Sequence, residues 1–300
     1  MQQAELALLE RAKRQGSARV LFWMLLLALG VSLGLGLALY LMGRSTGLGD
    51  AELMARFQAF REYLTAANAA LGILLLAAGP VLTLETLLLT SDSIAREQRA
   101  GAWATLVLTP LSAWQIVTGK WRAGQAYIYR HYRMIMGMRA VGFAWLAFTA
   151  SLNTFSRNGP DLLALMLGVV MVVGFLALNL ALAGALSLLA SFQGGRFASF
   201  GGAVSLQFIA VLAAAAFNVV LLRPLFEVEA GDAFYAAVMM AIVPIDSGVM
   251  VASQLTAPFE TSYSAVLALF ALLNAGLLVG LSLAALRLAR RLAIRQGAAA

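Results

Sequence analysis

The sequence predicts an all-α integral membrane protein with six transmembrane helices. Of its 300 residues, 62% are hydrophobic and only 12% are charged, whereas about a quarter of the residues of a soluble domain are charged. Six apolar segments are long enough to cross a bilayer, which takes roughly 20 residues of helix. Basic residues concentrate in alternate segments between these spans, as the positive-inside rule requires. The chain is therefore expected to be one transmembrane domain over residues 1–300.

Residues 1–19 are polar and precede the first apolar run. Leucines at positions 6, 8 and 9 fall on one side of a helix here and charged residues on the other, which predicts a helix lying on the membrane surface. A solvated tail is the alternative. A cleavable signal is not expected, because no small-residue cleavage pattern follows the apolar run.

The six expected spans are defined by apolar runs between charged segments. In chain order, they cover residues 20–42, 65–89, 134–155, 162–192, 200–222 and 264–288. The basic residues favour an orientation with the N-terminus inside. The inner segments then hold Arg11, Lys13, Arg14, Arg19, Arg96, Arg99, Lys120, Arg122, Arg130, Arg133, Arg196, Arg287, Arg290, Arg291 and Arg295. An even number of spans places both termini in the cytoplasm.

Two segments are expected on the outer side. Residues 50–64 have helical apolar spacing and predict a helix at the outer surface that leads into the second span. Residues 234–244 are apolar but too short to cross, which favours a re-entrant or interfacial helix ended by Pro244. Residues 223–263 as a whole are expected to form a small structured external cap before the sixth span.

The longest inner segment, residues 91–121, carries charges and tryptophans between two spans. A short polar helix is expected over 93–99, with an N-cap among residues 90–93, and Gly101 should interrupt it. An apolar stretch follows and should stop at Thr109-Pro110. Ser112 is placed to cap a new helix. Trp103, Trp114 and Trp121 are expected to anchor the segment at headgroup depth.

This inner segment resembles the one after the second span of the type-2 ABC transporter permeases, whose pattern is close to S-I-A-x-E-R-E-x-G-T-L-x-x-L-L-x-T-P-L-S followed by G-K. The matching residues here are Ser93, Ile94, Ala95, Glu97, Gly101, Leu106, Thr109, Pro110, Leu111, Ser112, Gly119 and Lys120. Gln98, Arg99 and Ala102 depart from the pattern. The order of features also resembles that family, with six spans, cytoplasmic termini and an external re-entrant region.

The resemblance implies that residues 91–121 couple the membrane domain to two copies of a separate ATP-binding subunit. The residues implied in this ATPase coupling are Ser93, Glu97, Gly101, Thr109, Pro110, Leu111 and Ser112. Glu97 is expected to contact the ATPase directly, with a solvated surface charge as the alternative. ATP and Mg would bind the partner and no cofactor would bind this chain, which has no phosphate loop, because tryptophans at positions 114 and 121 break that motif.

The resemblance further implies a permease subunit of an exporter in a bacterial cell membrane, which works by alternating access and pairs with a second, identical or related permease. A lipid or another amphipathic substrate would suit a pathway at the subunit interface. A non-transporting scaffold or assembly subunit of a larger membrane complex is the alternative. An ion-coupled carrier predicts paired charges in the spans, where only Arg139 and Glu85 lie in or near one.

Several residues outside the inner segment suggest packing roles. Gly30 and Gly34 permit close helix approach, either at a dimer seam or within one subunit. Asn179 and Asn274 are expected to form interhelical hydrogen bonds. The basic, aromatic stretch at residues 127–134 is expected to meet membrane lipids at the interface and no nucleic acid. With no cysteine and one histidine, thiolate and multi-histidine metal sites are excluded.

Overall fold

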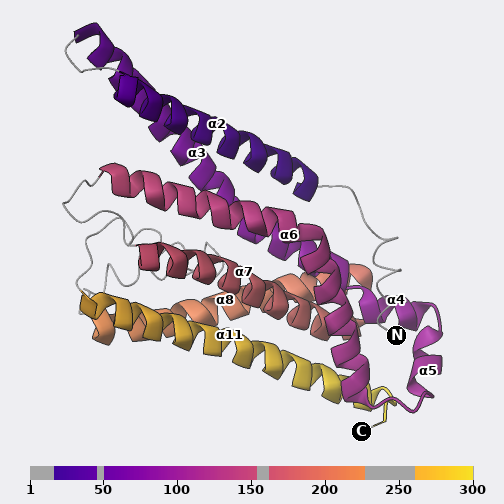
Figure 1. Cartoon of the computed structure of the whole chain (residues 1–300). Helices are drawn as coiled ribbons and strands as arrows, with labels where there is room; N and C mark the ends of the chain where they lie inside the picture. Colours follow the sequence, from indigo (N-terminus) through magenta and orange to yellow (C-terminus); the bar gives the residue numbers. More distant parts are fainter. Residues whose placement is uncertain (1–16, 46–50, 154–161, 227–260, 300) are drawn as a thin grey trace.

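A computed structural model of the chain describes residues 17–45, 51–153, 162–226 and 261–299 (Figure 1). The described residues form helices and no strands. The helices are α2 (Ser17–Ser45), α3 (Ala51–Thr90), α4 (Ser93–Arg99), α5 (Ala102–Val107), α6 (Ala113–Asn153), α7 (Leu162–Ala190), the 3₁₀ turn η1 (Ser191–Gln193), α8 (Arg196–Phe226) and α11 (Thr261–Arg295). The interfacial helix expected over 1–19 and the cap expected over 223–263 lie largely outside the described residues.

The long helices pack side by side into one bundle (Figure 1). Helix α7 lies at its centre and contacts α3, α6, α8 and α11, whereas α2 contacts α3 and α6 at one edge. Two large apolar clusters fill the interior, one between α2, α3, α6 and α7 and one between α6, α7, α8, α11 and the α4–α5 segment. The α4–α5 segment is therefore part of the packed core at its end of the bundle.

Among the described residues, five helices are long and apolar enough to cross a membrane. They are Arg19–Met42, Ala55–Arg99, Val172–Gln193, Phe197–Phe217 and Leu272–Arg295. These segments agree with five of the six expected spans and are compatible with a membrane protein. The third expected span lies in α6, whose first half is rich in lysine and arginine and which is not among the five. A crossing by α6 stays a prediction.

Two of the helices are longer than the sequence pattern indicated. The outer-surface helix expected over 50–64 is continuous with the second span in α3, because neither Gly nor Pro separates them and Pro80 lies inside α3 without ending it. The helix that starts after Ser112 likewise continues into the third expected span as α6. At 1.5 Å per residue each covers roughly 60 Å along its own path, about twice the hydrocarbon core of a bilayer, and α6 bends near its start, at the α4–α5 end of the bundle (Figure 1). The prediction that residues 50–64 are helical and lead into the second span is thus confirmed for the part of the segment in α3, and its place at the outer surface of a membrane stays a prediction.

Polar side chains join helices inside the bundle. Asn179 donates a hydrogen bond to the Thr83 hydroxyl (3.0 Å) and accepts one from the Gln207 amide (3.2 Å), which links α3, α7 and α8. The interhelical bonding expected of Asn179 is confirmed. Arg139 is fully buried, its Nε donates to the Leu75 carbonyl oxygen at 3.0 Å, and this fixes α6 against α3.

Candidate functional site

The α4–α5 segment lies at one end of the bundle, together with the starts of α2 and α6 and the end of α11 (Figure 1). The arginines of the last turns of α11 and the basic first half of α6 lie at this same end. The exposed arginine side chains here include Arg122, Arg130, Arg290 and Arg291. This end of the described bundle is therefore strongly basic.

A tight turn separates α4 from α5. Asp92 is the N-cap of α4, as expected, but its carboxylate binds the Arg99 guanidinium and makes no capping bond. Gly101 has φ +72°, the left-handed conformation that glycine adopts without strain. The interruption predicted at Gly101 is confirmed, and the glycine directs α5 away from the line of α4.

Replacing Gly101 by valine is expected to destabilise the turn by roughly 1–2 kcal/mol, since a β-branched residue disfavours positive φ. No heavy atom lies within 4 Å of the added Cβ position, so the cost is conformational and not steric. Asparagine tolerates this conformation better, so Gly101→Asn is the matched control and should cost less. The thermal unfolding midpoint in detergent measures both, and equal effects would contradict this account.

A buried ion pair ties α4 to α6. Lys120 Nζ lies 2.5 Å from Glu97 Oε1, and the two side chains are only 2% and 17% exposed. Burial in this apolar junction strengthens the attraction and makes either charge costly without the other. The Glu97 carboxylate is thus engaged within the chain, while its second oxygen, Oε2, has no hydrogen-bond partner among the described residues.

The link between α5 and α6 is fixed by local hydrogen bonds. Helix α5 ends at Val107, two residues before Thr109-Pro110, as predicted. The Ser112 hydroxyl accepts from the Gln115 amide nitrogen (3.3 Å), and the Gln115 side chain accepts from the Ser112 amide (2.9 Å). This reciprocal capping box confirms the cap expected at Ser112 and defines the start of α6.

The tryptophans of the segment differ in their surroundings. Trp103 is buried and packs edge-on against Phe192, with ring centroids 5.9 Å apart. The Trp121 indole donates to the Ala181 carbonyl oxygen at 3.0 Å, which ties α6 to α7. Anchoring of Trp103 at headgroup depth is therefore wrong, because its ring completes the core under α5. Of the three tryptophans, Trp114 is the exposed one.

The outer face of the segment presents an apolar tip. Leu108 is 86% exposed, the highest value in the segment among the large apolar side chains. Elsewhere in the segment Pro110, Gly101 and Arg99 are also exposed, whereas Ser93 is buried and Leu111 is partly buried against the core. The sequence pattern alone indicated neither the exposure of Leu108 nor the role of Lys120 as the partner of Glu97.

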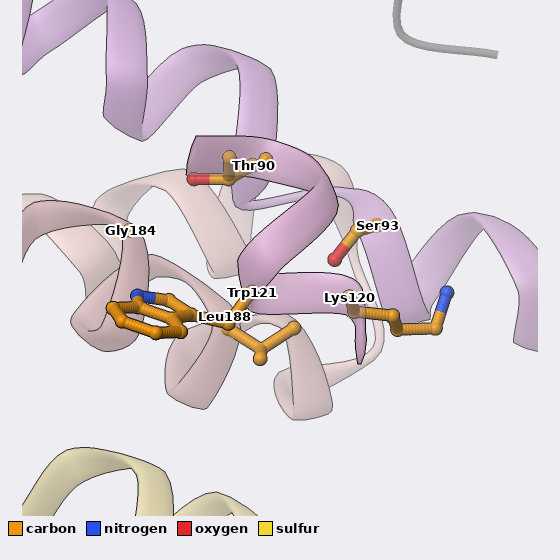
Figure 2. Close-up of a pocket in the computed structure, with 7 residues that line it drawn as sticks. Thr90, Ser93, Lys120, Trp121, Gly184 and Leu188 are labelled. Atoms are coloured by element: carbon orange, nitrogen blue, oxygen red, sulfur yellow. The ribbon is translucent and has the colours of Figure 1, made fainter. Parts of the chain in front are cut away.

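A small cavity lies behind the segment, between α3, α4, α6 and α7 (Figure 2). Its volume of about 10 Å³ is close to the minimum for a single water molecule. The hydroxyls of Thr90 and Ser93 and the small residue Gly184 line it, and the Ser93 hydroxyl has no partner among the described residues. In Figure 2, Lys120 and Trp121 extend from α6 in opposite directions. The cavity suits an ordered water and is too small for a substrate.

The two glycines singled out in α2 face away from the other described helices. A Cβ added at Gly30 or Gly34 would meet no described heavy atom within 4 Å, whereas one at Gly36 would lie 2.5 Å from the Trp145 ring. Within the part of the chain that the structure describes, close helix packing is thus found at Gly36 and not at Gly30 or Gly34. Among the described residues no group of three His, Cys, Asp or Glu side chains is placed to hold a metal ion.

No protein-family model, no curated protein and no solved structure matches this chain.

Proposed function

We propose that the chain is the membrane-spanning permease subunit of an ABC transporter, an exporter driven by a separate ATP-binding subunit. The observation that carries the proposal is the α4–α5 segment. It is a pair of short helices held rigidly between two long helices, with an exposed apolar tip at the basic end of the bundle. A segment with these properties suits the transfer of force from a partner outside the membrane.

The contacts of the segment support this mechanical role. A push on α4 reaches α6 through the Glu97–Lys120 pair. A push on α5 reaches η1, which directly follows α7, through the contact of Trp103 with Phe192. ATP binding in the partner would then favour one arrangement of the helices, which is alternating access by population shift. In this proposal Glu97 positions α4, and the exposed tip around Leu108 contacts the ATPase.

The distribution of charge supports the proposed sidedness. The starts of α2 and α6, the α4–α5 segment and the end of α11 share one end of the bundle, where most of the basic side chains gather. By the positive-inside rule this end faces the cytoplasm, which is where an ATPase would be. Both termini would then be cytoplasmic, in a bacterial cell membrane.

A second permease, identical or related, completes the proposed transporter. The open face around Gly30 and Gly34 would accommodate a close helix from this partner. In this proposal the substrate pathway lies between the two permeases, and the cavity behind the α4–α5 segment, which holds at most one water, is not part of it. An apolar seam of this kind favours a lipid or another amphipathic substrate.

Replacing Leu108 by aspartate is expected to reduce the amount of ATPase that co-purifies with the chain by about fivefold or more, because a carboxylate would be desolvated at the centre of the contact. The experiment is purification in mild detergent from native membranes, with quantitative mass spectrometry of the partner. Leu108→Met keeps an apolar side chain of similar size and is the control.

The wild-type chain decides between the two function classes in the same experiment. A stoichiometric ATP-binding-cassette subunit that is lost with Leu108→Asp and retained with Leu108→Met would support the transporter. Co-purification of other membrane subunits without any ATPase would contradict the proposed transporter function and would favour a scaffold within a larger complex. An ATPase retained equally by both variants would exclude the α5 tip as its contact.

A further inference from the structure

Residues Gln296–Ala299 leave the end of α11 in a defined turn. The Gly297 amide donates to the Ile294 carbonyl oxygen (3.0 Å) and the Ala298 amide to the Ala293 carbonyl oxygen (3.1 Å). Gly297 has φ +96°, which completes a Schellman motif at the helix C-terminus. This turn directs the following residues sideways, onto the α4–α5 segment.

The turn contacts each part of that segment. The Ala299 carbonyl oxygen accepts from the Ala113 backbone amide at 2.7 Å, and the Gln296 side-chain oxygen Oε1 accepts from the Gln98 side-chain nitrogen Nε2 at 2.8 Å. A Cβ added at Gly297 would lie 3.4 Å from the Val107 side chain. Residues of α4, α5 and α6 are thus all close to one short stretch that follows α11.

The hydrogen bond from Ala113 to Ala299 satisfies a backbone amide that α6 itself cannot pair. Ala113 is the first residue of α6, so its amide has no acceptor within that helix. Ala113 is fully buried, and an amide without a partner there would carry a desolvation cost. The Ala299 carbonyl supplies the acceptor, while Ala298, only 5% exposed, packs into the same apolar cluster as Trp103.

We propose that residues 296–299 are a clasp that positions the α4–α5 segment on α11. The clasp couples the α4–α5 segment to the end of α11, so that the two move together. The Glu97–Lys120 ion pair separately couples the segment to α6. An effect of the clasp on the binding of a partner ATPase rests on the function proposed above. The positioning of the α4–α5 segment by the clasp does not depend on that function. Two different measurements therefore test the two parts.

The test variant is Ala298→Asp, which places a carboxylate in the apolar cluster and should expel the clasp. Its matched control is Ala299→Asp, because the Ala299 side chain is exposed and its backbone carbonyl still accepts from Ala113. Amide hydrogen exchange of the purified full chain is followed in peptides that cover residues 93–99 and 107–116. Exchange in peptides from α7 reports whether each variant keeps its fold.

With Ala298→Asp we expect exchange in the two segment peptides to rise about fivefold or more while the α7 peptides stay protected, and Ala299→Asp to match the wild type. Unchanged exchange in the segment would overturn the clasp. If the α7 peptides also lose protection, the milder Gln98→Ala variant replaces Ala298→Asp, and it must raise exchange in the peptide over 93–99 for the proposal to stand.

The effect of the clasp on ATPase binding is tested with the same two variants, by measuring the amount of ATPase that co-purifies with each. Loss with Ala298→Asp and retention with Ala299→Asp is the expected result. Retention with both, despite faster exchange in the segment, would show that the clasp does not serve docking. If the wild-type chain itself carries no ATPase, the function proposed above fails, and the exchange data still decide whether the clasp positions the segment.

Discussion

Replacing Glu97 by glutamine is expected to lower the free energy of unfolding by about 3–5 kcal/mol, because it leaves the Lys120 ammonium buried without its carboxylate. The Lys120 side chain is 2% exposed, so bulk water has little access to the ammonium group once its partner is lost. Lys120→Met should be less damaging, because the Glu97 side chain retains 17% exposure and some access to solvent.

The double variant Glu97→Gln, Lys120→Met is the control for this prediction. It removes both charges together, so it should be more stable than Glu97→Gln alone. Denaturant unfolding in detergent micelles gives the three free energies. If the effects of the single variants simply add in the double variant, the two groups do not interact, and the proposed path of force from α4 to α6 is lost.

Replacing Gly36 by leucine is expected to destabilise the bundle by about 1–3 kcal/mol through overpacking. A Cβ at this position would already lie 2.5 Å from the Trp145 ring. Trp145 cannot shift freely, since its indole donates to the Ser32 hydroxyl at 2.6 Å, and Ser32 in turn donates to Asn68 of α3 at 2.5 Å. The added side chain would therefore disturb the junction of α2, α3 and α6.

Gly34→Leu, two residues earlier on the same helix, is the matched control. It faces open space in the described part of the chain and should leave the thermal midpoint of the isolated subunit unchanged or slightly raised. A comparable loss of stability in both variants would mean that the Trp145 contact is not the cause. Loss of a co-purified second permease with Gly34→Leu alone would support the proposed seam.

Much of the architecture follows from local sequence. Apolar runs of sufficient length predicted the helices, and five of them meet the length and apolarity of a membrane span. The turn at Gly101 and the cap at Ser112 were also predictable, because both depend on a single residue and its immediate neighbours. The candidate segment could thus be located from sequence, and so could the boundaries of its short helices.

The continuity of α3 and α6 was harder to predict. Both helices run through a change from polar to apolar sequence, and periodicity indicates such a change without indicating whether the helix ends there. The burial or exposure of individual side chains could not be predicted either. Trp103 is in the core and Leu108 is exposed, although both belong to one apolar stretch only a few residues long.

The sequence by itself determined the all-helical fold, the long apolar helices, and the position of the charged segment between two of them, because composition, periodicity and capping act over one or two turns of helix. Only the tertiary structure decided which groups meet across the segment. Glu97 and Lys120 are 23 residues apart and Gln98 and Gln296 are 198 apart. Such pairs depend on how whole helices pack against one another, and no local pattern in a single sequence encodes that distance.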